Sequence, residues 1–161
     1  MIKSKKLTKI KNLKHGFFNS TGGHSKKIYK SLNCGPGSLD NKINVKKNLQ
    51  IVRKKISNKA KNIFLLHQIH SNKFIFIDKK YNNRNKPKAD AIITDQRNIP
   101  IAVLTADCVP ILIYDGKTKM IAAIHAGWKG AFKGIISKVI KFMIKKGCEL
   151  ENITAVIGPS I

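Results

Sequence analysis

The most informative part of the sequence for the fold is residues 109–147, VPILIYDGKTKMIAAIHAGWKGAFKGIISKVIKFMIKKG. Two apolar runs, 109–114 and 120–124, lie on either side of the turn sequence DGKT. They predict two strands joined by a tight turn, and a connection this short permits only antiparallel pairing. Apolar residues then recur at helical spacing, which predicts a helix from about Ala131 to Lys146 with one buried face.

Shorter patterns on either side extend this arrangement to an α+β fold. Asp40 can cap a helix that runs to about Ile56, because apolar residues between them fall at steps of four and three. Further strands are predicted at 63–66, 74–77, 91–94, 101–104 and 154–157. Strands outnumber helices and most connections are short. We therefore expect one α+β domain over residues 1–161, with a mixed or antiparallel sheet and packed helices.

The composition limits the class of protein. A chain of 161 residues has the length of one domain. Its apolar runs are strand-sized and do not approach the ~18 residues that span a bilayer. The basic start lacks the apolar core of a secretory signal, and the three cysteines then predict reduced thiols in the cytoplasm. We expect no membrane partner.

The charge is strongly positive, with 32 basic and 8 acidic residues giving a net charge of +24. Such a balance is compatible with nucleic acid or another anionic surface. Lysine is spread along the whole chain, however, and only three of the basic residues are arginine, the side chain on which sequence-reading proteins rely. Nonspecific nucleic-acid binding is therefore an alternative and not the leading interpretation.

Two histidines and a cysteine near the ends of predicted strands form the candidate chemical site. His70 ends the segment HQIH, Cys108 interrupts the apolar stretch LTADCVP, and His125 directly follows a predicted strand. Two imidazoles and a thiolate suit zinc, and three protein ligands leave a fourth position for water or substrate. No compact zinc motif links them, so a buried structural cysteine and hydrogen-bonded histidines are the alternative.

The segment HAGWKG has a second property. Gly127 and Gly130 allow the backbone to turn tightly before the predicted helix, whose free amides attract anions, and Lys129 adds a cation. This pattern predicts a site for phosphate, the alternative being an ordinary strand-to-helix turn. Asp107 adjoins Cys108 within a cluster of aspartates, where it would orient a ligand, move a proton or cap a turn.

Several segments resemble the bacterial laccase-domain family, formerly called multicopper polyphenol oxidoreductases. The resemblance is carried, from about His15 to Ile161, by GGHSKKIYKSLNCGPGS, HQIHS, KADAIITD, LTADCVPILIYD, AAIHAGWKGAFKGII and VIGPSI. Members of the family continue well beyond the position of Ile161. The resemblance therefore implies a domain that lacks the family's C-terminal part, acting alone or completed by a second polypeptide.

The resemblance implies a zinc-dependent purine nucleoside phosphorylase. Family members cleave adenosine, inosine and methylthioadenosine with phosphate and can deaminate adenosine. The family's zinc ligands fall on His70, Cys108 and His125. Copper is less expected, since the chain has no His-X-His pair. The implied site residues are Cys108, His125 and Asp107 for catalysis and Lys129, Gly127, Gly130 and Asn33 for substrate or phosphate.

Other functions stay open at this point. Cys108 and His125 could instead form a nucleophile pair that hydrolyses amides, for example in cell-wall precursors, an activity also attributed to some relatives. The chain could also be an inactive fragment with a basic surface that binds RNA without specificity.

The family usually has an arginine where this chain has Lys129, which replaces a two-pronged donor with a point charge.

Overall fold

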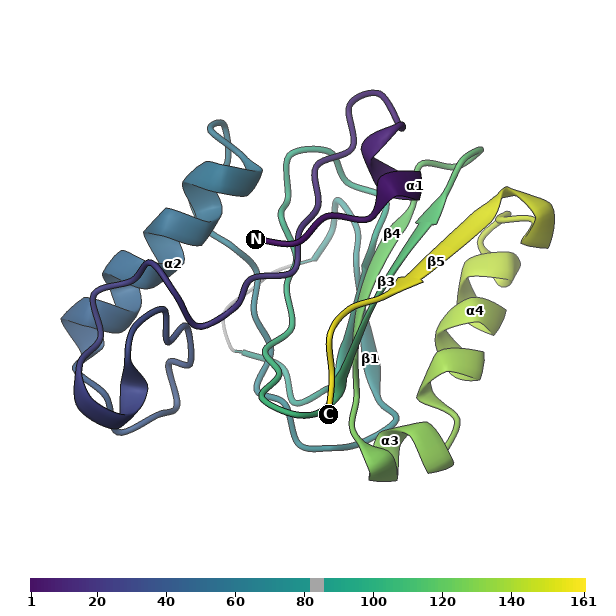
Figure 1. Cartoon of the computed structure of the whole chain (residues 1–161). Coiled ribbons are helices and arrows are strands. Elements are labelled where there is room, and N and C mark those ends of the chain that lie inside the picture. Colours follow the sequence, from purple (N-terminus) through teal and green to yellow (C-terminus); the bar gives the residue numbers. More distant parts are fainter. Residues whose placement is uncertain (82–85) are drawn as a thin grey trace. The chain divides into compact units, whose positions relative to one another are not determined.

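The computed structural model describes residues 1–81 and 86–161 (Figure 1). These residues divide into two compact units, Met1–Ile63 and Phe64–Ile161, each of which is described by itself. The prediction of a single domain over residues 1–161 stays a prediction. Among the described residues, no helix has both the length and the apolar character that crossing a membrane requires.

The first unit contains the predicted N-terminal helix. Its elements are α1 (Lys5–Thr8), the 3-10 helix η1 (Lys27–Tyr29) and α2 (Lys42–Ile56). Helix α2 ends at Ile56 as predicted, but its cap is Asn41, whose side chain accepts hydrogen bonds from the amides of Ile43 and Asn44. Asp40, the predicted cap, instead accepts from the amide of Asn41. The cap is therefore one residue later than the sequence pattern indicated.

The inner face of α2 carries a polar residue that the apolar pattern did not reveal. Val45 and Val52 are buried as predicted, and Asn48 between them is fully buried. Its side chain makes hydrogen bonds to the amide of His24, the hydroxyl of Ser25 and the carbonyls of Ser31 and Asn33. Because a buried amide is costly unless it is hydrogen-bonded, Asn48 fixes the glycine-containing loop against α2.

The second unit is built on a mixed sheet. Its elements are β1 (Phe74–Ile77), β2 (Ala91–Thr94), β3 (Val109–Asp115), β4 (Ile121–Ala126), α3 (Trp128–Phe132), α4 (Ile135–Lys145), the 3-10 helix η2 (Leu150–Asn152) and β5 (Ile153–Ile157). Within the described ranges the strand order is β1-β2-β4-β3-β5. Strand β1 runs parallel to β2, and the remaining pairs are antiparallel. The predicted α+β class with a mixed sheet is confirmed.

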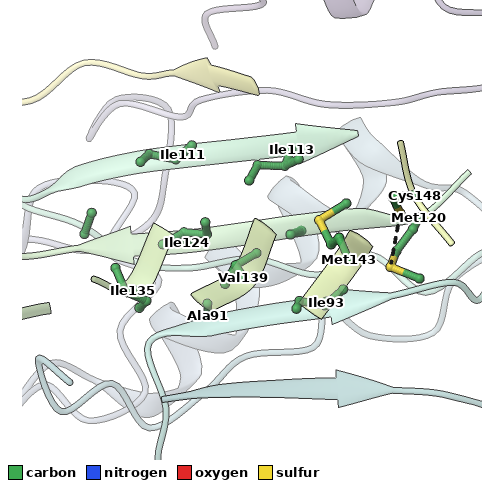
Figure 2. Packing of buried hydrophobic residues seen from close by; sticks show 12 residues of the cluster. Ala91, Ile93, Ile111, Ile113, Met120, Ile124, Ile135, Val139, Met143 and Cys148 are labelled. Carbon is green, nitrogen blue, oxygen red and sulfur yellow. Dashed lines mark hydrogen bonds between the residues drawn. The ribbon is translucent and has the colours of Figure 1, made fainter. Parts of the chain in front are cut away.

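Helix α4 covers one face of this sheet (Figure 2). Ile135, Val139 and Met143 on α4 are fully buried against a cluster that includes Ile93 and Ile124 of the sheet. Successive residues of a strand face opposite sides, so β2 also serves a second cluster on its other face. That second cluster contains Leu66, Ile77, Ala89 and Ile92.

The predicted helix after HAGWKG is interrupted. It begins earlier than expected, at Trp128, and Gly134 divides it into α3 and α4. Gly134 has a φ of 73°, a left-handed conformation that closes α3 and opens α4. Apolar spacing continues across this break, which is why the pattern predicted one helix.

The C-terminal end of α4 is as predicted. Gly147 follows the helix in a left-handed conformation with a φ of 93°. Its amide donates to the carbonyl of Ile144 at 2.9 Å, and the amide of Cys148 donates to that of Met143 at 3.1 Å. These two bonds form a Schellman cap, which satisfies the last carbonyls of the helix.

Two predicted strands are wrong. In the described residues, 63–66 and 101–104 contribute only an isolated parallel bridge between Phe64 and Ile101. Both runs are apolar because Phe64, Leu66 and Ile101 pack in the second cluster, and not because they belong to a longer ladder.

Candidate metal centre

The fold brings the candidate ligands to one end of the sheet. Because β3 and β4 are antiparallel, Val109 at the start of β3 pairs with Ala126 at the end of β4. Cys108 is the residue directly before β3, and His125 is the residue before Ala126 in β4, so both lie next to this pair. His70 lies in the loop before β1. The start of β1 pairs with the start of β2, which in turn pairs with the end of β4, so this loop lies at the same end of the sheet.

The three side chains form a compact donor set. One ligand atom from each of His70, Cys108 and His125 lies within 4.8 Å of the other two, and the two imidazole centroids are 4.8 Å apart. His125 is buried, Cys108 is partly buried and His70 is exposed. Zinc bonds to nitrogen and sulfur are about 2.0–2.3 Å long, so a bound ion would draw the donors closer together. The exposed His70 makes the cluster accessible to solvent, which suits a three-ligand site with a fourth position for water or substrate.

Gly127 provides space for this cluster. A Cβ atom at this position would lie 2.9 Å from Cδ2 of His70, 3.2 Å from Sγ of Cys108 and 3.6 Å from Cε1 of His125. Its φ is −70°, which any residue can adopt, so glycine is needed here for close approach and not for the tight turn that the sequence suggested. Because residue 127 has no side chain, the three donor side chains can approach one another closely.

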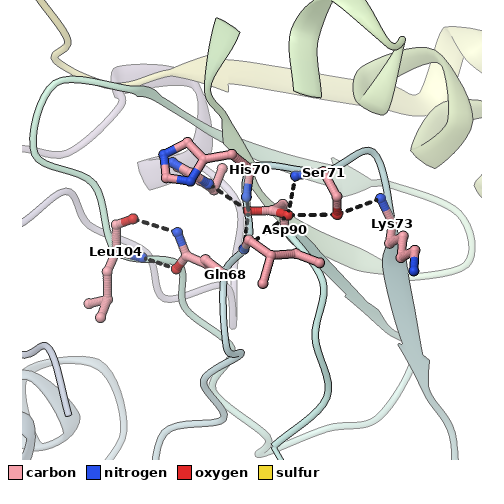
Figure 3. A network of polar contacts seen from close by, with 8 residues as sticks. Gln68, His70, Ser71, Lys73, Asp90 and Leu104 are labelled. Atoms are coloured by element: carbon pink, nitrogen blue, oxygen red, sulfur yellow. Dashed lines mark hydrogen bonds and ion pairs between the residues drawn. The ribbon is translucent and has the colours of Figure 1, made fainter. Parts of the chain in front are cut away.

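Asp90 connects the two histidines. Figure 3 shows its carboxylate beside His70 and Ser71. Its buried carboxylate accepts a hydrogen bond from Nδ1 of His125 at 2.9 Å and from the amide of His70 at 3.0 Å. It also accepts from the amide of Ser71 at 2.6 Å, the hydroxyl of Ser71 at 2.7 Å and the amide of Ile69 at 3.2 Å. A single carboxylate thus fixes an imidazole ring and the backbone that carries the other imidazole.

The ionisation of Asp90 determines which histidine nitrogen is available. Burial alone would raise the pKa of Asp90, but the hydrogen bonds from Ser71, His125 and His70 lower it below its ordinary value. An ionised carboxylate only accepts, so Nδ1 of His125 must carry the proton. This leaves Nε2 as the ring nitrogen that can bind a metal, the arrangement common in carboxylate–histidine–metal sites.

The backbone at His70 adopts an unusual conformation. Its φ is 55°, in the left-handed region that non-glycine residues rarely occupy. This conformation turns three successive amides, those of Ile69, His70 and Ser71, toward the Asp90 carboxylate. Left-handed backbone costs roughly 1–2 kcal/mol, which several hydrogen bonds to a charged group offset. The position of His70 is therefore imposed by Asp90.

Three of the residues predicted to bind substrate or phosphate, Gly127, Lys129 and Gly130, lie in or directly before α3. Lys129 is exposed, and its Nζ lies 5.3 Å from the centroid of the Trp128 ring. Helix α3 has only five residues, so its dipole adds little, and the anion-binding prediction depends on the Lys129 charge. A Cβ at Gly130 would lie 2.7 Å from the carbonyl oxygen of Ser71. Gly130 thus allows α3 to approach the loop that carries His70.

Two other predicted site residues, Asp107 and Asn33, are not among the three grouped metal-ligand candidates. Asp107 is exposed next to Cys108, and its carbonyl accepts from the amide of Ile161 at 3.2 Å. Asn33 belongs to the first unit, where its amide group donates to Ser38 and Asp40 and accepts from Gly35. Its side chain therefore orders its own loop. Roles in catalysis for Asp107 and in substrate binding for Asn33 stay predictions.

Sequence reasoning missed the role of Asp90. The acidic cluster Asp90, Asp95, Asp107 and Asp115 stands out in so basic a chain, but the sequence suggests a chemical role only for Asp107 and a turn for Asp115. The available signal was an aspartate directly before the fully apolar run AII in KADAIITD. A carboxylate that enters a buried strand needs several donors, and these come from a loop about twenty residues away.

The chain is similar to known proteins over most of its length, including the residues of the candidate site. The family model described as multi-copper polyphenol oxidoreductase laccase matches residues 14–161. A Bacteroides thetaiotaomicron protein named purine nucleoside phosphorylase is 32% identical over 100% of this chain and 63% of its own length. A Streptomyces coelicolor protein of the same name is 32% identical over 91% of this chain and 60% of its own length.

Solved structures have the same fold. A Neisseria meningitidis protein matches with a TM-score of 0.76 and 33% identity, over 88% of this chain and 55% of that chain. A Bacillus licheniformis hypothetical protein matches with a TM-score of 0.79 and 30% identity, over 88% of this chain and 56% of that chain. The chain therefore spans less than two thirds of the length of the relatives it matches.

Proposed function

The chain belongs to the family described as multi-copper polyphenol oxidoreductase laccase, and we propose that it is a zinc-dependent purine nucleoside phosphorylase. The observation that supports this most is the meeting of His70, Cys108 and His125 around the space left by Gly127. The names of the Bacteroides and Streptomyces relatives support the reaction class. The proposed substrates are inorganic phosphate and adenosine, inosine or methylthioadenosine.

The donor set supports zinc over copper. One thiolate and two imidazoles are borderline ligands that zinc accepts in a three-ligand open site. The sequence contains no His-X-His pair of the kind expected in multicopper sites. When bound, zinc would act as a Lewis acid and lower the pKa of a bound water.

The proposed reaction is a displacement at the anomeric carbon. A phosphate oxygen forms the new C–O bond, the C–N bond to the purine breaks, and the base leaves with a proton. Lys129 would hold the phosphate by its charge, while the hydrogen bonds of Asp90 to His125 and to the His70 backbone would keep the metal ligands in place. Such positioning and electrostatic complementarity account for much of the catalysis in reactions of this kind. Deamination of adenosine, in which water displaces ammonia, is a proposed second activity.

A direct assay tests this function. Zinc-loaded chain is incubated with adenosine, with and without phosphate at constant ionic strength, and adenine and ribose 1-phosphate are measured by chromatography. The proposal predicts phosphate-dependent release of both products in equal amounts, lost in Cys108→Ser. Absence of phosphate-dependent adenine release from chain that demonstrably holds zinc would contradict the phosphorylase function.

The same geometry favours a second candidate, a cysteine amide hydrolase. Cys108 lies beside His125, and Asp90 holds Nδ1 of that histidine, the order of groups found in nucleophile–base–carboxylate triads. A metal chelator separates the two functions: a thiol hydrolase keeps its activity after the metal is removed and forms an acyl-cysteine, whereas the phosphorylase is inactivated.

A further inference from the structure

Gln68 makes a two-point contact with the segment that leads to Cys108 (Figure 3). Its Nε2 donates to the carbonyl of Leu104 at 2.7 Å, and its Oε1 accepts from the amide of Leu104 at 2.7 Å. A carboxamide has the same donor and acceptor as a peptide unit. The Gln68 side chain therefore pairs with Leu104 as a neighbouring strand would.

This contact takes the place of backbone pairing between the segment before His70 and the segment before Cys108. The two segments are paired at Phe64 and Ile101, where the amide of Ala102 donates to the carbonyl of Phe64 at 3.1 Å. Beyond that bridge, in the part of the chain that the structure describes, the pairing passes to the Gln68 side chain. Gln68 lies two residues before His70, and Leu104 lies four residues before Cys108.

Asp90 and Gln68 hold different pairs of candidate ligands. The hydrogen bonds of the Asp90 side chain reach His125 and the backbone of residues 69–71. The Gln68 side chain reaches the segment before Cys108, whose residues Thr105 to Asp107 are exposed. Without Gln68, the His70 loop would lose its side-chain connection to that segment.

We propose that Gln68 is a positioning residue that fixes the separation of His70 from Cys108 and thereby sets the affinity for the metal. This inference rests on the proposed zinc site. Side chains that orient metal ligands typically change metal affinity by about 10-fold to 100-fold when they are replaced. The effect should appear in metal binding itself and not only in turnover.

The test compares Gln68→Leu with the wild-type chain and with Asn72→Ala. Asn72 also lies two residues from His70, but its side chain donates to the carbonyl of Lys133 at the end of α3, at 2.7 Å, and not to the segment before Cys108. Zinc affinity is measured by competition with a chelating dye, and cobalt substitution reports the thiolate-to-metal charge-transfer band. Thermal midpoints of the metal-free proteins record the purely structural cost of each change.

Gln68→Leu is expected to lower zinc affinity about 10-fold to 100-fold and to weaken or shift the cobalt–thiolate band, while Asn72→Ala leaves both unchanged. Wild-type affinity and an unchanged band in Gln68→Leu would overturn the inference, as would an equal loss in Asn72→Ala. If Gln68→Leu does not fold, Gln68→Glu, which keeps the acceptor for the Leu104 amide, must show the same loss. A wild-type chain that binds neither metal would overturn the proposed function itself.

Discussion

Asp90 accepts hydrogen bonds from three successive backbone amides, the Ser71 hydroxyl and the His125 ring beside the candidate site. It is fully buried, ionised, and bonded to one histidine ring and to the backbone of the other. Asn at this position keeps the shape but loses the charge and presents one acceptor oxygen where there were two. Hydrogen bonds to charged groups contribute about 1.5–3 kcal/mol each, so the consequences should be measurable.

We predict that Asp90→Asn lowers the free energy of unfolding by about 3 kcal/mol and zinc affinity by about 10-fold to 100-fold. Urea unfolding of the metal-free protein measures the first effect, and dye competition measures the second. Asp95→Asn is a matched control, since Asp95 is exposed and follows β2 at its other end. Equal zinc affinity in Asp90→Asn and wild type would show that Asp90 does not orient the ligands.

Gly127 is the second decisive residue. A methyl group at this position would lie closer than ordinary contact distance to His70 and to the Cys108 sulfur. We predict that Gly127→Ala folds but binds zinc at least 10-fold more weakly, because the donors must move apart. Gly37→Ala serves as the control, since a Cβ there meets nothing within 4 Å. Full zinc affinity in Gly127→Ala would mean that the donors do not surround an ion at this position.

At the scale of elements, the turn between β3 and β4 depends on Asp115. Its buried Oδ1 accepts from the amides of Lys117 and Thr118 and from the Thr118 hydroxyl. Burial alone would raise the pKa of Asp115, but these hydrogen bonds lower it below its ordinary value. A lowered carboxyl pKa contributes stability above the unfolded value of about 3.9, and this stability is lost as the pH falls through the folded pKa.

We therefore predict that Asp115→Asn lowers the free energy of unfolding by about 1–3 kcal/mol at pH 7, and that this difference shrinks below about pH 4. Urea unfolding of both proteins across pH 3 to 7 gives the difference directly, which cancels the contribution of Asp90. A difference that stays constant with pH would show that the Asp115 charge is not responsible.

The elements differ in how well the sequence reveals them. Strands β2 and β3 and the end of α2 were predictable, because β-branched runs and apolar spacing report local structure directly. The division of the helix at Gly134 was not, since the apolar spacing continues across a left-handed residue. The sequence wrongly predicts a strand at 101–104 because packing in an apolar cluster produces the same composition as pairing in a sheet.

The candidate site was predictable as a set of residues but not as a geometry. The trio and Lys129 follow from residue types and from the family resemblance. The role of Asp90 depends on amides that the fold brings to it, and the role of Gly127 depends on how closely three side chains approach. Both are properties of distance between remote segments, which a sequence pattern does not contain.

The positive charge of the whole molecule affects how the function must be tested. Asp40 is the only acidic residue among residues 1–63, and it is buried, so ionised side chains on the surface of that unit are positive. Such a surface binds anions without specificity, and this binding weakens with salt. Phosphate dependence must therefore be measured at constant ionic strength to separate the site from the surface.

Zinc is expected to stabilise the whole chain. A ligand at 100 times its dissociation constant raises the free energy of unfolding by about 2.7 kcal/mol if it binds only the folded state. We predict a zinc-dependent rise in the thermal midpoint that a chelator reverses and Cys108→Ser abolishes. Cys34→Ser should keep the rise, since Cys34 lies in the first unit and burial raises the pKa of its thiol to about 11. A rise that survives in Cys108→Ser would place the ion elsewhere.

X-ray absorption at the zinc edge shows whether three remote side chains share one zinc ion. For chain loaded with one equivalent of zinc, we predict one sulfur and two imidazole nitrogens in the first coordination shell, with the sulfur lost in Cys108→Ser. A shell without sulfur, or one that Cys108→Ser leaves unchanged, would contradict this prediction.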